Sequence, residues 1–291
     1  MSTIGFIGLG AMGSRIAGRL LDAGHQVYGT NRTRSKAQPL IERGLQWRAT
    51  PRDVAHPSDV IFSMVSDDAA LEAVASGPDG ILAGLQGGKV YIDMSTVSPR
   101  ISRQVAERVS ALGAHMLDAP VSGSIPQAES GTLAIFVGGD EAAFAGVEQL
   151  LRELGQAVTH VGTNGRGLLL KLAVNISLAV QTLAFSEGLL LAERGGIDPR
   201  VAAEAMSTSS IASPMLKTRV PLLLDLPKQA WFDVALMEKD IHLARDAADE
   251  LSIRLPSAAV ADKMLARASE LGYAHRDLAA LHEVLAETPA A

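Results

Sequence analysis

The sequence has no cysteine, and that absence excludes several kinds of chemistry. A chain without thiols forms no disulfide, has no thiol nucleophile and binds no metal through thiolates. The seven histidines are scattered without the spacing of metal ligands, so we expect no bound metal. The sequence also contains neither the Gly-x-Ser-x-Gly turn of many hydrolases nor a P-loop. The chemistry of this chain must come from other groups.

An excess of positive charge is also missing. The formal net charge of −6 gives no field that would attract nucleic acid, so we expect no nucleic-acid partner. Basic residues cluster only between Arg32 and Lys36. The N-terminus has no charged segment followed by a cleavage-site pattern, which a secretory signal would show. We therefore expect a cytoplasmic protein.

No apolar run reads as a simple membrane span. The richest one extends from Leu168 to Leu191, and polar side chains interrupt it at Lys171, Asn175, Gln181 and Glu187. Charged side chains are unfavourable inside a bilayer, so we expect no membrane insertion. With 47% hydrophobic residues in a chain of 291, there is enough apolar material for one large domain or two medium ones.

The first half of the chain alternates strand and helix patterns. Apolar runs typical of strands end near Thr30, Met64, Asp93, Leu117 and Val137, with a last short strand over Ala157–Val161. Helical patterns cover Ser35–Arg43, Asp67–Ala75, Pro99–Leu112 and Glu141–Leu154. This alternation predicts an α/β domain with a mainly parallel, doubly wound sheet of the Rossmann kind.

The second half is helical. A long helix is predicted over about 167–193, and later helices over Pro199–Met206, Asp233–Leu251, Pro256–Leu271 and Asp277–Leu285. Prolines at positions 214, 221, 227 and 256 mark the links between them. We expect a Rossmann domain over residues 1–163 and an all-α domain over residues 164–291, joined by the long interdomain helix.

The most informative motif lies at the N-terminus. A short apolar strand runs directly into Gly8-Leu9-Gly10-Ala11-Met12-Gly13, and a helical pattern follows. Gly8 permits a tight turn, Gly10 lets a pyrophosphate approach the backbone, and Gly13 allows close helix–strand packing. The free amides at the helix start then face the phosphates. This order of strand, glycines and helix predicts a dinucleotide site.

The next strand ends in Asn31-Arg32-Thr33. An NAD site usually has Asp or Glu here, whose carboxylate binds the ribose 2′-OH and would repel a 2′-phosphate. This chain has a neutral amide followed by a guanidinium, which can bind phosphate in a bidentate way. The alternative is a solvated basic loop. We expect NADP(H) as cofactor, with NAD(H) disfavoured.

Two further segments follow predicted strands. In Asp93-Met94-Ser95-Thr96, the hydroxyls either contact the nicotinamide or its ribose, or cap the helix that begins at Pro99. The loop from Asp118 to Ser124 is rich in amides and hydroxyls, and Ser122 lies within it. That loop either binds a substrate carboxylate or is an ordinary turn.

Lys171 and Asn175 stand four residues apart on an otherwise apolar face of the long helix. If Lys171 points into a crevice, desolvation lowers its pKa and makes it a usable proton donor. The alternative is a lysine that extends to solvent at the helix start. Lys239-Asp240, on a later helix, either reaches the cofactor or forms a plain surface salt bridge.

Together these segments resemble the β-hydroxyacid dehydrogenase family, which includes 3-hydroxyisobutyrate dehydrogenase and the glyoxylate/succinic semialdehyde reductases. The similarity covers nearly the whole chain, and five motifs occur in the family order. The resemblance implies a homodimer or homotetramer that acts on a small carboxylate-bearing aldehyde or hydroxyacid. It implies Lys171 as general acid/base. The other implied site residues are Ser122, Gly123, Ser124 and Asn175 toward substrate, and Met64, Val65, Thr96 and Lys239 toward cofactor.

Two departures from the family pattern matter. Many members have Ser-Gly-Gly where this chain has Ser122-Gly123-Ser124, and many have paired asparagines where Val174 precedes Asn175. The second departure resembles the glyoxylate/succinic semialdehyde reductase branch. Imine reductases share the Asn-Arg-Thr segment but usually replace the lysine, so Lys171 argues against that activity. A non-catalytic NADP-binding scaffold is the other alternative, and the retained Lys171, Asn175 and Ser122 disfavour it.

Overall fold

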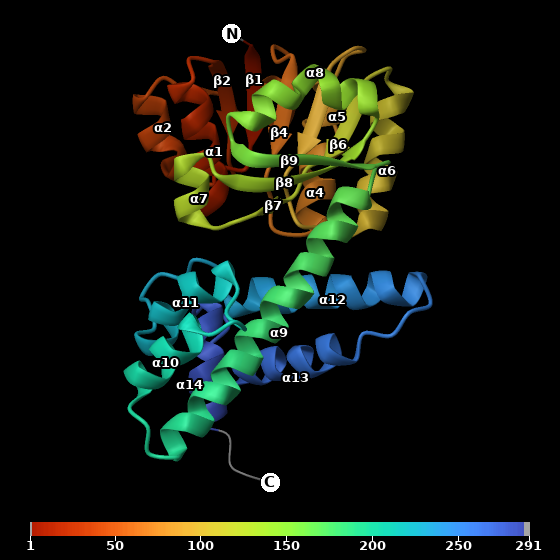
Figure 1. Cartoon of the computed structure of the whole chain (residues 1–291). Helices are drawn as coiled ribbons and strands as arrows, with labels where there is room; N and C mark the ends of the chain where they lie inside the picture. The colour runs from red at the N-terminus through yellow and green to blue at the C-terminus, as the bar shows by residue number, and fades with distance from the viewer. Residues whose placement is uncertain (1, 288–291) are drawn as a thin grey trace. The chain divides into compact units, whose positions relative to one another are not determined.

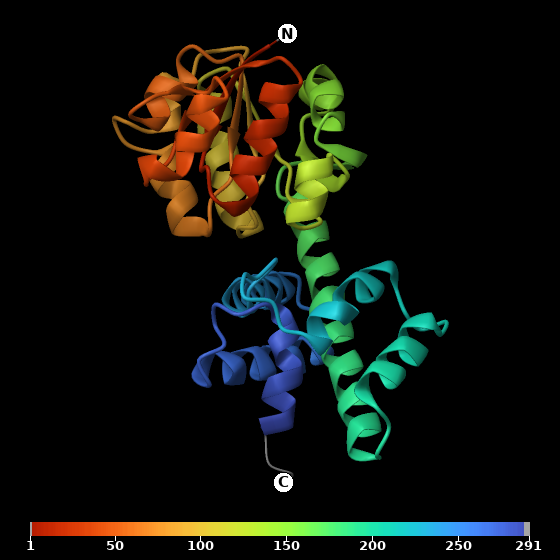
Figure 2. The same cartoon turned by 90° about the vertical axis from the view of Figure 1, so that its left-hand side faces the viewer.

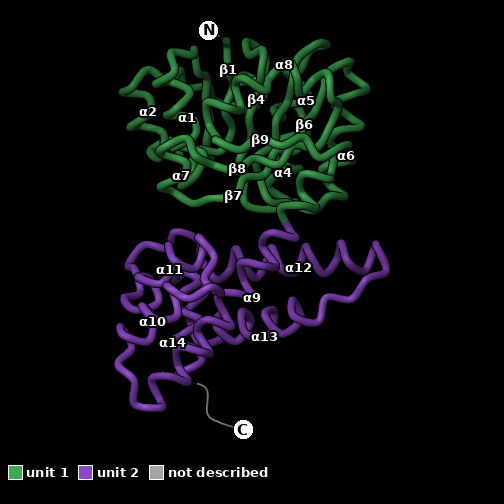
Figure 3. The backbone as a smooth tube through the Cα atoms, viewed as in Figure 1, with its two compact units in different colours: residues 1–171 green, residues 172–291 purple. Residues whose placement is uncertain are grey.

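The computed structural model describes residues 2–287, which divide into two compact units after Lys171. Figure 3 shows the two units in different colours. Unit 1 is an α/β domain and unit 2 is entirely helical, so the predicted fold class is confirmed. The boundary expected between residues 163 and 164 lies in the short connection from the last strand of unit 1 to the long helix α9.

A single sheet of nine strands forms unit 1 within the described residues (Figure 1). Its order is β3-β2-β1-β4-β5-β6-β8-β7, with β9 beside β8. The strands from β3 to β6 in this order are parallel, whereas β8 runs antiparallel to β6 and β7. Their bounds are β1 Thr3–Ile7, β2 Gln26–Thr30, β3 Gln46–Trp47, β4 Val60–Ser63, β5 Val90–Asp93, β6 His115–Asp118, β7 Val121–Ser122, β8 Leu133–Gly139 and β9 Gly155–Gly162.

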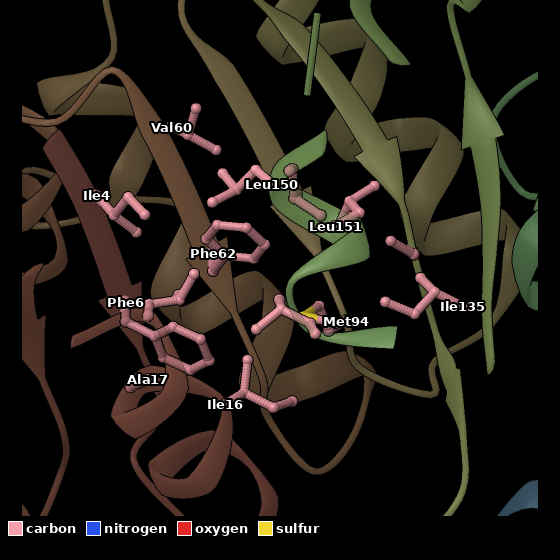
Figure 4. Close-up of a cluster of buried hydrophobic side chains, with 14 of the residues drawn as sticks. Ile4, Phe6, Ile16, Ala17, Val60, Phe62, Met94, Ile135, Leu150 and Leu151 are labelled. Carbon is pink, nitrogen blue, oxygen red and sulfur yellow. The ribbon is translucent and has the colours of Figure 1, made fainter. Parts of the chain in front are cut away.

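Helices cover both faces of this sheet (Figures 1 and 2). One core cluster joins the sheet to α1 (Ala11–Asp22), α2 (Gln38–Glu42), α7 (Ile125–Ser130) and α8 (Glu141–Arg152). Within this cluster, Phe6 of β1 and Phe62 of β4 stack with their ring centroids 5.9 Å apart. Figure 4 shows both side chains among their neighbours. The opposite cluster joins the sheet to α3 (Pro51–Ala55), α4 (Asp68–Ala75), α5 (Ile81–Gly84) and α6 (Pro99–Ala111). Both faces are buried, which is why these strands are short apolar runs.

Unit 2 continues the long helix α9 (Arg166–Arg194), whose first residues belong to unit 1. Three core clusters of unit 2 form along α9, one through Leu172, one through Ala179 and Leu183, and one through Phe185 and Leu189. The remaining elements are α10 Pro199–Thr208, α11 Pro214–Leu224, α12 Val234–Glu250, α13 Pro256–Glu270, a 3₁₀ turn Leu278–Ala280 and α14 Leu281–Glu287.

A buried ion pair fixes one corner of unit 2. Arg219 Nη1 lies 3.0 Å from Asp277 Oδ1, and Trp231 donates its backbone N–H to Asp277 Oδ2 at 2.8 Å. Asp277 is fully buried, so both its oxygens need these partners. The carboxylate thus joins α11 to the segment that precedes α14.

Helix α9 is long and apolar enough to cross a membrane by length and composition alone. The core helix of a soluble protein passes the same test. Its buried residues contribute to three core clusters of unit 2, as those of a core helix do.

Four helices differ from the sequence prediction. The short helices α3 and α5 were not predicted, the loop expected after Asp118 contains the short helix α7, and the proline-rich link contains α11. Pro214 sits at the first turn of α11, where a missing N–H is tolerated, and Ser213 caps that turn. Pro221 lies inside α11 on its exposed side, while Leu216 and Leu223 pack into the core. Burial of one apolar face outweighs the proline.

Candidate cofactor and substrate site

In the turn between β1 and α1, the three glycines differ in why a side chain is disfavoured. Gly8 has φ +93°, and a Cβ there would lie 2.2 Å from the Met64 carbonyl oxygen. A Cβ at Gly13 would lie 2.0 Å from the Gly8 carbonyl oxygen. Gly10 is the N-cap of α1, has no side-chain cap, and its Cβ would meet nothing within 4 Å. The fold therefore requires Gly8 and Gly13, whereas the space beside Gly10 is open to a ligand.

The residues between these glycines differ in exposure. Leu9 is buried and packs into the sheet core, and its backbone N–H is donated to Asn31 Oδ1 at 3.1 Å. Ala11 and Met12 form the first turn of α1, with Ala11 exposed and Met12 packed partly against the same core. This hydrogen bond connects the segment before α1 to the residue that follows β2.

Asn31 connects the two loops at the ends of β1 and β2. Besides accepting from Leu9, its side chain donates Nδ2 to the Thr33 carbonyl oxygen at 3.0 Å. A carboxylate could accept but not donate, so Asn suits this position better than the Asp of many NAD sites. Arg32 and Thr33 are exposed, and Arg32 has no hydrogen bond or ion pair within residues 2–287.

Two other arginines near this loop lie against aromatic rings. The guanidinium of Arg34 lies 5.5 Å from the Trp47 ring centroid, and that of Arg48 lies 4.4 Å from the Tyr28 ring centroid. Sequence reasoning grouped Arg34 with Arg32 and missed Arg48, because Arg48 follows β3 and reaches this region only through strand pairing. Unlike Arg34, Arg32 makes no hydrogen bond, ion pair or aromatic contact within residues 2–287.

The buried hydroxyl of Ser95 connects the segments that follow β4 and β5. Val65 donates its backbone N–H to Ser95 Oγ at 2.8 Å, and Ser95 Oγ donates to Asp93 Oδ1 at 2.7 Å. Ser98, rather than Ser95 or Thr96, caps α6 by accepting from Ile101 N–H. The capping alternative for Ser95 and Thr96 is therefore wrong. Helix α6 begins at Pro99, and only Ser98 immediately precedes it.

Asp93 is fully buried beneath this segment, and burial raises its pKa. Hydrogen bonds from Ser63 and Ser95 act in the opposite direction without cancelling the effect. Met64 follows the end of β4, Thr96 follows the end of β5, and both residues are half-buried. The ends of β1, β4 and β5 thus form one edge of the sheet, which is where open α/β sheets bind ligands.

The segment expected to bind substrate turns sharply after β7. Ser122 pairs with Ala134 in the sheet, and its hydroxyl makes no hydrogen bond within residues 2–287. Gly123 has φ +131°, and a Cβ there would lie 2.8 Å from Leu133. A side chain at Gly123 would therefore be strained as well as crowded.

Ser124 explains one departure from the family pattern. It is the N-cap of α7, and its backbone N–H donates to Gln127 Oε1 at 2.9 Å. A serine in place of glycine starts this helix through a capping box. The Ser124 amide expected to bind a carboxylate is already hydrogen-bonded, and it becomes available only when the Gln127 side chain moves away.

Lys171 is the last residue of unit 1 and lies in the second turn of α9. Its exposed fraction is 8%, which is low for a lysine that extends along a helix into solvent. The segment that precedes it is tied to the sheet. Asp118, at the end of β6, accepts the backbone N–H of Gly165 at 2.7 Å and of Leu168 at 3.0 Å. Sequence reasoning missed this role of Asp118, because its partners lie far along the chain.

In unit 2, a second polar cluster is buried. Asn175 Nδ2 donates to Asp240 Oδ2 at 2.5 Å, and Lys239 Nζ lies 2.7 Å from Asp240 Oδ1. Asp240 is 2% exposed, so the plain surface alternative for the Lys239–Asp240 pair is wrong. The other side-chain atom of Asn175, Oδ1, is buried without a hydrogen bond within residues 2–287. Over the same residues, no group of three or more His, Asp or Glu side chains could hold a metal ion.

Comparison with known proteins covers both units. Residues 3–162 match the family described as the NAD binding domain of 6-phosphogluconate dehydrogenase. Residues 165–285 match the family described as NAD-binding of NADP-dependent 3-hydroxyisobutyrate dehydrogenase. Together the two matches span nearly the whole chain.

Two curated relatives are similar to almost the whole of this chain. The chain is 37% identical to 2-hydroxy-3-oxopropionate reductase of Escherichia coli over 282 residues, 97% of this chain and 96% of the relative. It is 34% identical to the chloroplastic glyoxylate/succinic semialdehyde reductase 2 of Arabidopsis thaliana over 283 residues, 97% of this chain and 79% of the relative.

Solved structures agree with the fold. A 3-hydroxyisobutyrate dehydrogenase of Mycobacterium tuberculosis with L-serine superimposes with a TM-score of 0.86 at 29% identity. That match covers 98% of this chain and 99% of the other. The chain therefore belongs to the β-hydroxyacid dehydrogenase family and is an NAD(P)-dependent dehydrogenase.

Proposed function

We propose that this protein is an NADP-dependent oxidoreductase that interconverts a small carboxylate-bearing aldehyde and the corresponding hydroxyacid. Lys171 is its general acid/base. The observation that carries the proposal is a buried lysine in the second turn of the helix that follows a complete dinucleotide-binding sheet. Buried lysines are rare unless a specific interaction or a function requires them.

NADP(H) is the proposed cofactor, and the loop after β2 supports it. Asn31 is neutral and bridges two loops, and the exposed Arg32 has no partner on the described chain. A 2′-phosphate would meet the Arg32 guanidinium and the Thr33 hydroxyl, with the further cations Arg34 and Arg48 nearby. The pyrophosphate would lie on the amides of α1 beside Gly10, where the backbone has open space.

The proposed substrate carries a carboxylate. The Ser122 hydroxyl and the amide of Gly123 are the donors that would bind it. Ser124 contributes its amide when Gln127 moves aside. Asn175 has its amide nitrogen committed to Asp240, so it would accept a hydrogen bond from the substrate hydroxyl through Oδ1.

When bound, the nicotinamide supplies or accepts a hydride at C4, which is the chemistry the chain itself lacks. In the reductive direction, Lys171 Nζ donates a proton to the carbonyl oxygen as negative charge develops there. In the oxidative direction, neutral Lys171 takes the hydroxyl proton instead. A positioned acid/base contributes roughly 10²–10⁴-fold to the rate.

A steady-state screen of the purified protein tests the proposal. NADPH and NADH are each assayed with glyoxylate, succinic semialdehyde, methylmalonate semialdehyde, tartronate semialdehyde and simple cyclic imines. Turnover of one or more semialdehydes with NADPH is expected. Turnover of imines alone would identify an imine reductase. Tight NADPH binding with no turnover across the panel would identify a non-catalytic scaffold.

Assembly and location are also part of the proposal. Exposed apolar side chains such as Leu191, Val201 and Ile211 in unit 2 support a homodimer or homotetramer. Light scattering after size-exclusion chromatography would show a mass of at least twice 30.5 kDa. The net charge of −6 is consistent with a cytoplasmic protein that binds neither nucleic acid nor membrane.

A further inference from the structure

We propose that Asp118 is a positioning residue for Lys171. Its carboxylate ties the start of α9 to the end of β6 and so sets where the lysine ammonium lies. This inference rests on the proposed role of Lys171. It gives a function to Asp118, which has none in the proposed reaction.

The carboxylate uses both oxygens to hold α9. Oδ1 accepts from Gly165 N–H at 2.7 Å and Oδ2 accepts from Leu168 N–H at 3.0 Å. These are amides at the start of a helix, which have no acceptor within the helix and carry partial positive charge. A carboxylate therefore suits this end of α9 by hydrogen bonding and by charge. The cap comes from another strand rather than from the residue before the helix.

The surrounding backbone leaves room for this carboxylate only because two residues are glycine. A Cβ at Gly138 of β8 would lie 2.6 Å from Asp118 Oδ1, and a Cβ at Gly167 of α9 would lie 2.9 Å from Asp118 Oδ2. The Gly167 Cβ would also lie 2.4 Å from the Phe136 carbonyl oxygen. Strands β6 and β8 and helix α9 thus meet around one buried anion.

The residue immediately before α9 is Gly165, which has no side chain to cap the helix. Asn164, one residue earlier, donates its Nδ2 to the Met116 carbonyl oxygen at 2.8 Å. Met116 and Asp118 lie on the same strand, β6. Two independent contacts therefore attach the segment before α9 to this one strand.

The lysine follows this anchor by one helical turn. Leu168, whose amide Asp118 accepts, is three residues before Lys171, and its side chain is fully buried in the core of unit 1. Because a helix is rigid over one turn, a shift of the Leu168 amide moves the Lys171 backbone with it. Misplacement of a catalytic group by about 1 Å can reduce the rate about 100-fold.

Burial of this carboxylate is unfavourable, which argues for a specific reason to keep it. Desolvation raises the pKa of Asp118 to about 6, even though the amides of Gly165 and Leu168 lower it. Asp93, its neighbour across the β5–β6 register, raises it further. A neutral cap would avoid this penalty but would bind only one of the two amides.

The test compares Asp118→Asn with Asp140→Asn. The first variant keeps the shape of the side chain, but its amide nitrogen faces a backbone N–H, so one of the two bonds is lost. The second makes the same change at the exposed N-cap of α8, where Asp140 accepts from Ala143 N–H. Asparagine is an equally good cap there, so this control should retain wild-type activity.

Three readouts are expected to change together in Asp118→Asn. The kcat for the best semialdehyde falls at least 10-fold, the basic limb of the kcat–pH profile shifts, and hydrogen exchange over residues 165–168 speeds up. The Kd for NADPH stays within about twofold, because the Gly8–Gly13 turn lies on other strands. Wild-type kcat and pH profile with faster exchange would make Asp118 merely structural and overturn the proposal.

Failure of the proposed function gives a different result. If wild-type protein turns over nothing in the panel, the proposed role of Lys171 is wrong. The two variants would still differ in hydrogen exchange over residues 165–168. If Asp118→Asn does not fold, exchange in the wild type decides. Slow exchange at Gly165 and Leu168 supports the anchor, and exchange as fast as in an open loop overturns it.

Discussion

At the scale of single residues, three polar side chains carry the proposed chemistry, and each is held differently. Lys171 is buried, Arg32 is exposed without a partner on the described chain, and Asn31 bridges two loops by accepting and donating at once. A buried cation suits proton transfer, whereas an exposed guanidinium suits capture of a phosphate. Variants of these residues should therefore separate turnover from cofactor binding.

Lys171→Ala should lower kcat by roughly 10²–10⁴-fold and leave the Kd for NADPH nearly unchanged, because a general acid/base acts on the reacting oxygen and not on the nucleotide. Stopped-flow and fluorescence titration would measure the two quantities. Lys217→Ala, at an exposed position on α11, is the matched control. Near-normal turnover of Lys171→Ala would remove the lysine from the mechanism.

Arg32→Ala should reduce the preference for NADPH over NADH by about 10- to 100-fold, because one charge-assisted hydrogen-bonded contact contributes roughly 1.5–3 kcal/mol. The ratio of the two kcat/KM values measures this preference. Arg100→Ala, on the exposed side of α6, controls for a general loss of positive charge. An unchanged ratio in Arg32→Ala would show that NADP selectivity lies elsewhere.

At the scale of elements, the turn between β1 and α1 separates residues required by the fold from residues required by the ligand. Gly8 and Gly13 approach the backbone of neighbouring segments, but the space beside Gly10 is empty. A motif read as one unit in the sequence therefore contains two kinds of constraint, and substitution should distinguish them.

Gly10→Ala should lower the free energy of unfolding by only about 1 kcal/mol, because alanine is a poorer N-cap than glycine but its methyl group meets no neighbour. It should weaken NADPH binding at least 10-fold, since the new methyl group occupies the proposed position of the pyrophosphate. Gly13→Ala should instead destabilise unit 1 strongly. Denaturant titration and NADPH titration of both variants check this, and equal losses in both would contradict it.

The junction of β6 with α9 should give a pH-dependent stability. The pKa of Asp118 is about 6 in the folded chain, above the ordinary 3.8, so the folded state binds the proton more tightly than the unfolded state. The stabilisation by this proton is full below pH 3.8 and is lost as pH rises through about 6.

Asp118→Asn lacks this titration. The stability of wild type relative to the variant should therefore fall by about 2 kcal/mol between pH 4 and pH 7. Urea denaturation of both proteins at several pH values would measure the difference. Asp93 is present in both proteins, and its contribution to stability changes with pH in the same direction. A difference that rises with pH would contradict the assignment.

At the scale of the whole molecule, periodicity carried most of the prediction. Strand β2 ends at Thr30 as predicted, and α6 and α9 agree with their predicted ranges within a few residues, because apolar patterns report the buried face directly. The unpredicted helices are short or contain proline. Helix α7 begins inside a Ser-Gly-Ser-Ile-Pro segment whose residues favour turns as strongly as helix starts.

The site was less predictable than the fold, since its contacts join distant residues. Local spacing was enough to single out Gly8, Gly10 and Gly13. By contrast, the bonds from Asp118 to Gly165 and Leu168 depend on a complete sheet, and no local pattern signals them. The occupied amide of Ser124 likewise depends on the side-chain conformation of Gln127.

The two tryptophans give each unit its own optical reporter. Trp47, under the Arg34 guanidinium, belongs to unit 1, and Trp231, beside the buried Asp277, belongs to unit 2. The chain has no others. In Trp231→Phe, intrinsic fluorescence would therefore follow the melting of the nucleotide-binding half alone, and in Trp47→Phe that of the helical half. Whether the two halves unfold as one cooperative body thus becomes a question of comparing two emission curves.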